Sequence, residues 1–225
     1  MNVIRSLLAA AACVGLATVA FGHGDVTPQP VNTDALPEIG EEWLTENPYR
    51  SSVAGEEVWA KAMEIGNSGY NQNCARCHGL GVVSGGLAPD LRYLEASEVG
   101  DEWFVERFQH GATQDGVTKM PAFGEVLGQK AGWAIRTYIE TRPEDGALDD
   151  HAARLLEIRD ALAAGTDDST ALAAELTEIS SKVVTASGAP VADNAAREAA
   201  LLLNGTPEGV KKAADALTIV LSAAH

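Results

Sequence analysis

The sequence predicts an all-α protein in which one helical domain is followed by an Ala-rich helical extension. Hydrophobic residues make up 46% of the 225 positions, and alanine supplies much of that fraction. This composition favours helices packed through small side chains over a β-rich core. Apolar residues also recur at helical spacing, and the amino-acid composition changes after Pro143. A length near 225 residues allows one large domain or two small ones.

The charge and the cysteine count exclude two classes of protein. The chain carries 16 Lys and Arg residues against 32 Asp and Glu residues, a formal net charge of −16. This acidity repels the phosphate backbone of nucleic acids, so no nucleic-acid partner is expected. Three cysteines are too few for a disulfide scaffold.

Residues 1–22 have the composition of a secretory signal peptide. Arg5 precedes an apolar run that is too short to cross a bilayer comfortably, and small residues end this run. A retained membrane anchor and a lipoprotein site at Cys13 are the alternatives. We expect an exported, periplasmic protein with no permanent membrane anchor, whose remaining cysteines are Cys74 and Cys77.

Residues 23–55 are expected to form an extended N-terminal arm. Four prolines break up this stretch: Pro28, Pro30, Pro37 and Pro48. We expect the arm to lie over the next domain, residues 56–146, with Trp43 and Tyr49 as anchors.

Residues 74–78 contain the spacing Cys-x-x-Cys-His. Two thiols one helical turn apart suit the two vinyl groups of a porphyrin, and the adjacent imidazole suits its iron. The motif predicts one covalently bound haem c, with thioether bonds to Cys74 and Cys77 and with His78 as an axial iron ligand. A structural zinc site would need a second ligand pair, which the sequence lacks. A thioredoxin-like dithiol would need βαβ surroundings rather than helical flanks.

The glycine-rich stretch 79–91 superficially resembles a phosphate-binding loop. It lacks the P-loop lysine, and its glycines do not match Gly-x-Gly-x-x-Gly. We interpret it as a flexible wrap around the edge of the haem.

Residues 101–110 suit a short helix that places Trp103, Phe104 and Phe108 near the haem pocket. Arg92, Arg107 and Trp103 are candidate hydrogen-bond donors to the haem propionates, and ordinary surface pairing or core packing is the alternative for each.

The second axial ligand is expected to be Met120. It lies 42 residues after His78, in a stretch that we read as a loop between two helical segments, and Pro121 follows it. Met63 falls on a helical apolar stripe, which favours core packing. His110 and Lys119 are the remaining candidates for this position.

These residues resemble the class I c-type cytochromes. The resemblance rests on Gly66 and Tyr70 before the Cys-x-x-Cys-His motif, on Pro89, on Met120-Pro121 and on a terminal helix with Trp133 and Tyr138. It implies that the Pro89 carbonyl accepts a hydrogen bond from the His78 imidazole and so orients it. It also implies that helices near 56–71 and 129–142 cross and pack.

A narrower resemblance covers roughly residues 23–142. The segments 71–80, 84–92 and 133–142 look like the cytochrome c-550 group associated with quinoprotein alcohol dehydrogenases. This resemblance implies a periplasmic donor that depends on pyrroloquinoline quinone, and an acceptor that is cytochrome c oxidase or another cytochrome. It also places signal-peptide cleavage before His23.

Residues 147–225 are expected to form four helices in an Ala-rich extension. Apolar stripes run along this segment: Leu155, Ile158 and Leu162, then Leu172, Leu176, Ile179 and Val183. Expected helix starts are Asp149, Asp167, Asp193 and Thr206-Pro207, and expected stops are Gly165, Gly188 and Gly205. A docking or oligomerisation module and a passive structural cover are the two hypotheses for its role.

Together these observations predict an electron-transfer protein rather than an enzyme, because no protein acid, base or nucleophile is required. A different periplasmic donor is one alternative. A haem protein with an open sixth site for ligand binding or catalysis is the other. Arg5 is the only charged residue in 1–22, so cleavage leaves 15 basic and 32 acidic residues, a formal charge of −17. We therefore expect a partner with a basic surface patch.

Overall fold

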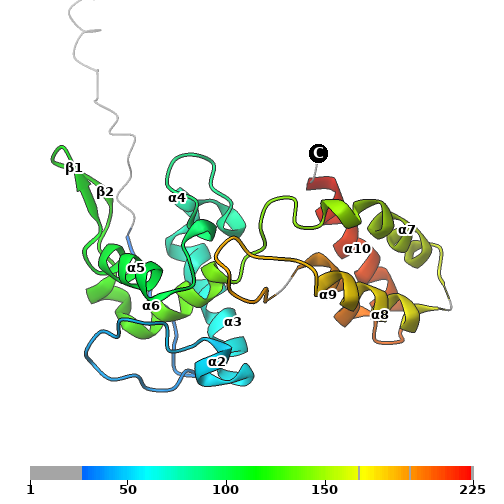
Figure 1. Ribbon diagram of the computed structural model, residues 1–225, viewed down its shortest axis with the longest axis horizontal. Helices are drawn as coiled ribbons and strands as arrows, with labels where there is room; N and C mark the ends of the chain where they lie inside the picture. The colour runs from blue at the N-terminus through cyan, green and yellow to red at the C-terminus, as the bar shows by residue number, and fades with distance from the viewer. Residues whose placement is uncertain (1–26, 167, 193, 224–225) are drawn as a thin grey trace, which may run out of the picture.

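The computed structural model describes residues 27–166, 168–192 and 194–223, so the expected signal peptide lies outside the described residues. Among the described residues the regular elements are helices, as the sequence predicted, apart from one two-stranded hairpin. It forms two lobes, α2 to α6 with the hairpin and α7 to α10, which are joined by two stretches of chain (Figure 1). Within the described ranges no helix combines the length and hydropathy needed to cross a membrane.

The first lobe is built mainly on two long helices. Its elements in chain order are α2 (Ser51–Ala54), α3 (Glu56–Asn73), α4 (Ala75–His78), the 3-10 turns η2 (Leu80–Val82) and η3 (Leu91–Tyr93), α5 (Glu98–His110), β1 (Ala112–Gln114), β2 (Val117–Met120) and α6 (Gly124–Glu140). Gly128, at φ 73°, separates the first turn of α6 from the rest, so the continuous part of the helix begins after it, as expected. Helix α5 begins earlier than expected, because the Ser97 hydroxyl accepts from the Gly100 N–H and caps it.

Helices α3 and α6 cross at a glycine. A Cβ on Gly66 would lie 2.0 Å from the Ala134 carbonyl oxygen, so the two backbones are in contact there. One turn later, a Cβ on Gly69 would lie 3.1 Å from the Ile135 side chain. This close crossing places the C-terminal end of α3, and the Cys-x-x-Cys-His segment after it, against the middle of α6.

The N-terminal arm packs over the first lobe as expected. The Gln29 N–H donates to Asn73 Oδ1 at 2.6 Å, just before Cys74. The Gln129 side chain of α6 donates to two carbonyls of the arm. Tyr49 is fully buried, and the ring centre of Trp43 lies 6.0 Å from that of Phe108. Both expected anchors therefore contact the domain.

The hairpin is an element that the sequence reading missed. Strands β1 and β2 pair antiparallel, with Ala112 opposite Met120. The turn between them is Asp115-Gly116, and both residues have positive φ, 52° and 74°. Asp-Gly between two short strands is the usual signal for such a turn. Met120 therefore ends a strand, whereas the sequence reading placed it in a loop.

The second lobe contains the four expected helices. Its elements are η4 (Asp149–His151), α7 (Ala152–Ala163), α8 (Ser169–Ser180), α9 (Ala195–Leu202) and α10 (Pro207–Ala223). Leucine, isoleucine and alanine side chains form its core, which is separate from the core of the first lobe. The expected starts Asp167 and Asp193 lie outside the described residues; Asn194 caps α9 by accepting from the Arg197 N–H.

The segment between α8 and α9 returns to the first lobe, and we call residues 183–192 the strap. The expectation that Val183 continues the stripe of α8 is wrong, because the helix ends at Ser180, and Gly188 lies within the strap rather than at a helix end. The Ala96 N–H donates to the Ser187 carbonyl at 2.8 Å, and the Glu144 N–H donates to the Val184 carbonyl at 3.1 Å. Backbone hydrogen bonds thus connect the strap to the first lobe.

Candidate haem-binding site

A cavity of about 400 Å³ in the first lobe brings together the residues that the sequence singled out. Cys74, Cys77, His78, Pro89 and Met120 all line it. Cys74 lies between α3 and α4, Cys77 and His78 belong to α4, Pro89 belongs to the glycine-rich stretch, and Met120 ends β2. Most of the remaining wall is aromatic or aliphatic, and the volume lies in the range of cofactor pockets.

The two thiols and the imidazole are placed by a single helical turn. The N–H groups of Cys77 and His78 both donate to the Cys74 carbonyl, at 3.1 and 3.0 Å. Both thiols are free. Burial, with a smaller effect of Cys77, raises the pKa of the Cys74 thiol to about 12. A dithiol redox centre needs a lowered thiol pKa, so this environment argues against the thioredoxin-like alternative.

The His78 ring is oriented by the glycine-rich stretch. Its Nδ1 lies 2.9 Å from the Pro89 carbonyl oxygen, which can only accept, so Nδ1 carries the proton and Nε2 is left with its lone pair. The stretch is itself closed by a 2.5 Å hydrogen bond from the Ser84 hydroxyl to the Ala88 carbonyl. Gly79 lies where a Cβ would meet the Val83 carbonyl oxygen at 1.8 Å, so this position requires glycine.

Met120 is held at the cavity by the hairpin and by a close contact with Gly111. A Cβ on Gly111 would lie 2.3 Å from the Met120 carbonyl oxygen, and Gly111 also has a positive φ of 68°. Just after Met120, the Phe123 N–H donates to the Phe108 carbonyl at 2.8 Å. The backbone on both sides of the Met120 thioether is therefore fixed against α5.

The other sixth-ligand candidates have different surroundings. Met63 is 9% exposed in the core cluster, where the Thr141 hydroxyl contacts its sulfur at 2.8 Å, and it does not line the cavity. The His110 side chain is 65% exposed beside Glu106, and it lines a different cavity. Lys119 does line the cavity with Met120.

The candidate propionate donors divide into two groups. Arg107 and Trp103 line the cavity, with the guanidinium carbon 5.8 Å from the indole centre. Arg92 does not line it. Its guanidinium is held by Asp90 at 2.7 Å and by Asp145 at 2.5 Å, and hydrogen bonds to Arg92 lower the pKa of both carboxyls. Arg92 therefore acts in an ion pair between the glycine-rich stretch and the chain after α6.

Aromatic rings form one wall of the cavity. Phe104 and Phe108 of α5 are stacked at 5.6 Å between centres, and Phe123 lies 5.8 Å from Phe108. Sequence reasoning found the first two of these rings. It missed the ion pairs that join Arg50, Asp101, Arg136 and Glu140 behind this wall, because Arg50, Asp101 and the α6 pair lie far apart in the chain and leave no periodic signal.

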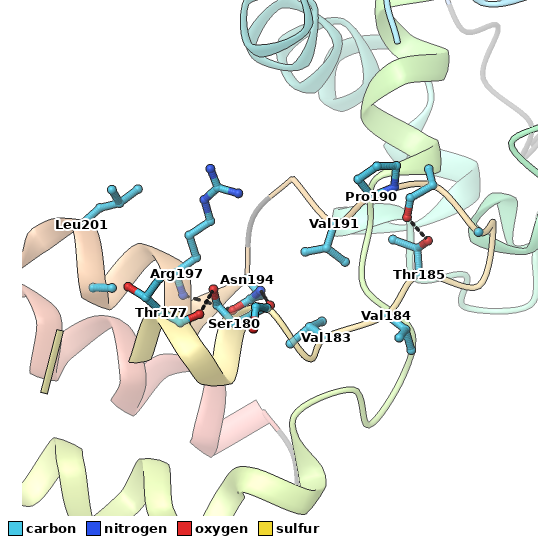
Figure 2. A pocket seen from close by; sticks show the side chains of 14 residues that line it. Thr177, Ser180, Val183, Val184, Thr185, Pro190, Val191, Asn194, Arg197 and Leu201 are labelled. Atoms are coloured by element: carbon cyan, nitrogen blue, oxygen red, sulfur yellow. Dashed lines mark hydrogen bonds between the residues drawn. The ribbon is translucent and has the colours of Figure 1, made fainter. Parts of the chain in front are cut away.

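A larger cavity of about 790 Å³ lies between the strap and helices α8 and α9 (Figure 2). Its hydroxyl groups are used within the protein: Thr185 donates to the Ala189 carbonyl at 2.6 Å, and Ser180 donates to the Thr177 carbonyl at 3.0 Å. Its lining residues include no Cys, His or Met. It therefore offers no iron ligand, and the smaller cavity is the candidate site.

The donor set fits haem c better than a metal ion alone. Two thiols, one imidazole with a free Nε2 and one thioether face a mainly apolar cavity, which suits a porphyrin with covalent attachment and two axial ligands. Among the described residues, no group of three His, Cys, Asp or Glu side chains is placed to hold a metal ion. A structural zinc site would need four such ligands.

Comparisons with known proteins point in the same direction. Residues 61–139 match the family described as cytochrome C oxidase, cbb3-type, subunit III. A cytochrome c550 of Pseudomonas aeruginosa is 51% identical over 140 residues, which cover 62% of this chain and 94% of that protein. No solved structure gives a significant match.

Two longer proteins of Pseudomonas putida match over part of their length. The quinohemoprotein alcohol dehydrogenase ADH IIB is 33% identical over 106 residues, 47% of this chain and 14% of that protein. The quinohemoprotein alcohol dehydrogenase ADH-IIG is 32% identical over 84 residues, 37% of this chain and 11% of that protein. With the cytochrome c550 covered almost completely, the chain belongs to the class I c-type cytochromes, a family of electron carriers.

Proposed function

We propose that this chain is a periplasmic carrier of one electron at a time that holds one covalent haem c. It accepts electrons from a quinoprotein alcohol dehydrogenase and passes them toward a terminal oxidase, with cytochrome c oxidase or another cytochrome as the acceptor. The observation that carries this proposal is the convergence of Cys74, Cys77, His78 and Met120 on one cavity.

The residues of the site divide the work of holding the cofactor. Cys74 and Cys77 would hold the porphyrin through thioether bonds, and His78 and Met120 would ligate its iron. The Pro89 carbonyl fixes the His78 ring and increases its basicity. Bound haem supplies the Fe(III)/Fe(II) couple, and a thioether ligand raises its potential relative to two histidines.

The proposed donor rests on similarity and on charge. The chain resembles part of two quinohemoprotein alcohol dehydrogenases, whose names combine a quinone, a haem and alcohol oxidation. Acidic residues outnumber basic ones in both parts of the chain, by 20 to 9 in residues 23–146 and by 12 to 6 in residues 147–225. This acidity supports a docking partner with a basic patch.

Stopped-flow reduction of the oxidised holoprotein tests the donor. We expect rapid reduction by a purified dehydrogenase containing pyrroloquinoline quinone in the presence of its alcohol, and a rate that falls as salt is added. A periplasmic dehydrogenase without this cofactor serves as the control. Equal reduction by both enzymes would point to a different donor, and a rate independent of salt would contradict steering by charge.

An absorption spectrum of the native holoprotein tests the axial ligands. His/Met ligation predicts a weak far-red band in the oxidised form and a ferrous form that does not bind carbon monoxide. A high-spin ferrous form that binds carbon monoxide would instead favour a haem protein with an open sixth site.

Export is tested by fractionation. We propose that residues 1–22 direct the chain to the periplasm and are removed before His23, without leaving a membrane anchor. The mature protein is then expected in the periplasmic fraction with His23 as its first residue. Recovery with the membranes, or a retained N-terminus, would favour the anchored alternatives.

For residues 147–225, the contacts of the strap support a structural role. Ser187 joins the strap to the first lobe, because its hydroxyl contacts the Glu140 carbonyl and its own carbonyl accepts from the Ala96 N–H. A docking or oligomerisation role is the rival hypothesis, and the exposed Val184 and Leu201 beside the larger cavity are the residues to test. A monomeric mass, and unchanged dehydrogenase kinetics on replacing both with Ser, would support the structural role.

A further inference from the structure

Four charged side chains meet inside the first lobe, away from the proposed iron ligands. Arg50 comes from the arm, Asp101 from α5, and Arg136 and Glu140 from α6. Arg50 lies 2.7 Å from Asp101 and 2.8 Å from Glu140. Arg136 lies 2.9 Å from Asp101 and 3.7 Å from Glu140. We call these four residues the charge quartet.

The quartet is buried and its hydrogen bonds are satisfied. Asp101, Arg136 and Glu140 are at most 1% exposed, and Arg50 is 18% exposed. Asp101 accepts from Arg50 and Arg136 on one oxygen and from the Asn47 N–H, at 2.8 Å, on the other. With all four side chains ionised, the net charge of the quartet is zero.

The quartet lies directly behind the wall of the haem cavity. The Arg136 guanidinium carbon is 6.0 Å from the ring centre of Phe104, which lines the cavity. Asp101 precedes Phe104 by one turn of α5. Glu140 follows Ile139, which also lines the cavity. Phe104 and Ile139, the wall residues next to the quartet, are apolar, so the fields of these charges are weakly screened there.

We infer that the charge quartet tunes the midpoint potential of the haem, and that the charges of Asp101 and Arg50 shift this potential in opposite directions. This inference rests on the proposed haem site. Reduction adds one electron to the site, so a nearby carboxylate opposes it and a nearby guanidinium favours it. Removing one member leaves an uncompensated charge of the opposite sign. An uncompensated positive charge raises the midpoint potential, and an uncompensated negative charge lowers it.

Redox titration of three holoprotein variants tests this inference. Asp101→Asn removes a negative charge and is expected to raise the potential. Arg50→Gln removes a positive charge at the edge of the quartet and is expected to lower it by a smaller amount. The double variant is expected to fall between the two single variants. Because the charges are buried, the shifts should persist at high salt.

Opposite signs separate this electrostatic effect from simple loosening of the fold. Loosening admits water to the cavity and would move the potential in the same direction in both single variants. Arg154→Gln is the matched control, because Arg154 is paired with Glu175 at 2.6 Å in the second lobe and should leave the potential unchanged.

Shifts of the same sign, or no shift in either variant, would overturn the inference. If Asp101→Asn does not fold, Arg50→Gln decides alone, because an unchanged or raised potential in that variant contradicts the proposal. Failure of the proposed haem site is a separate outcome: the wild-type chain would then lack covalent haem or its far-red band.

Discussion

The Tyr70 hydroxyl donates a 2.8 Å hydrogen bond to the carbonyl oxygen of Gly79. Tyr70 belongs to α3 and is fully buried, whereas Gly79 directly follows His78. This bond ties the long helix to the far end of the Cys-x-x-Cys-His turn. It fixes the backbone next to His78, and it does so independently of the hydrogen bond between His78 and Pro89.

Replacement of Tyr70 with Phe is expected to destabilise the fold by about 1 kcal/mol, because the Gly79 carbonyl loses its donor. Burial raises the pKa of the Tyr70 hydroxyl, so it remains a donor throughout the neutral range. Chemical denaturation measures the difference. Tyr93→Phe is the control, because Tyr93 is 56% exposed, and its stability should be that of the wild type.

Replacement of Met120 with Ala is expected to abolish the far-red band of the oxidised holoprotein and to lower its potential, because the variant lacks the proposed thioether ligand of the iron. Met63→Leu is the matched control, since Met63 packs in the core and does not line the cavity. Loss of the band in the Met63 variant alone would reverse the ligand assignment. Optical and potentiometric titration distinguish these results.

Replacement of Gly66 with Ala is expected to destabilise the protein by about 1–3 kcal/mol or more, because its Cβ would lie 2.0 Å from the Ala134 carbonyl oxygen. The helices α3 and α6 must separate to admit the methyl group. Gly85→Ala is the control, because no atom lies within 4 Å of a Cβ there. Similar melting temperatures for the two variants would show that the crossing tolerates a side chain.

Replacement of Asp145 with Asn is expected to reduce stability near neutral pH but not in strong acid. Hydrogen bonding to Arg92 lowers the pKa of Asp145 below its unfolded value of about 3.9. A lowered folded pKa contributes stability above the unfolded pKa, and this contribution is lost as the pH falls through the folded pKa.

The effect of Asp145→Asn should be below about 1 kcal/mol, because Asp145 is 65% exposed and water screens the pair. Thermal unfolding from pH 7 to pH 2 measures it for both proteins. The gap between the two curves should begin to close below about pH 4, the unfolded pKa, and should vanish once the pH has fallen through the lower folded pKa. A gap that widens in acid would contradict the role of this ion pair.

Much of the site could be predicted from local spacing. Cys74, Cys77 and His78 are brought together by one helical turn, which is a property of the chain itself. The position of Met120 at the same cavity depended on a ligand argument, and its strand was missed although Asp115-Gly116 carries the signal for a hairpin turn. The single turn of α6 before Gly128 was not expected, because Gly128 interrupts the helical conformation there.

The role of Arg92 illustrates why other parts could not be predicted. Nothing in the local sequence shows whether its guanidinium points to a propionate or to carboxyls, and the partner Asp145 lies 53 residues away. The strap is a similar case, because Val183 fits the apolar period of α8 although that helix ends at Ser180. A buried residue in a turn can be apolar and fall at the same spacing as a buried residue on the helix, so the apolar pattern does not distinguish them.

The sequence by itself determined the fold class, the covalent attachment motif and the candidate axial ligands, because these depend on short-range periodicity and on side-chain chemistry. Only the tertiary structure decided that Arg50, Asp101, Arg136 and Glu140 share one buried site, and that the strap rejoins the first lobe. The physical reason is that ion pairs and backbone contacts between distant segments form only when packing brings those segments together.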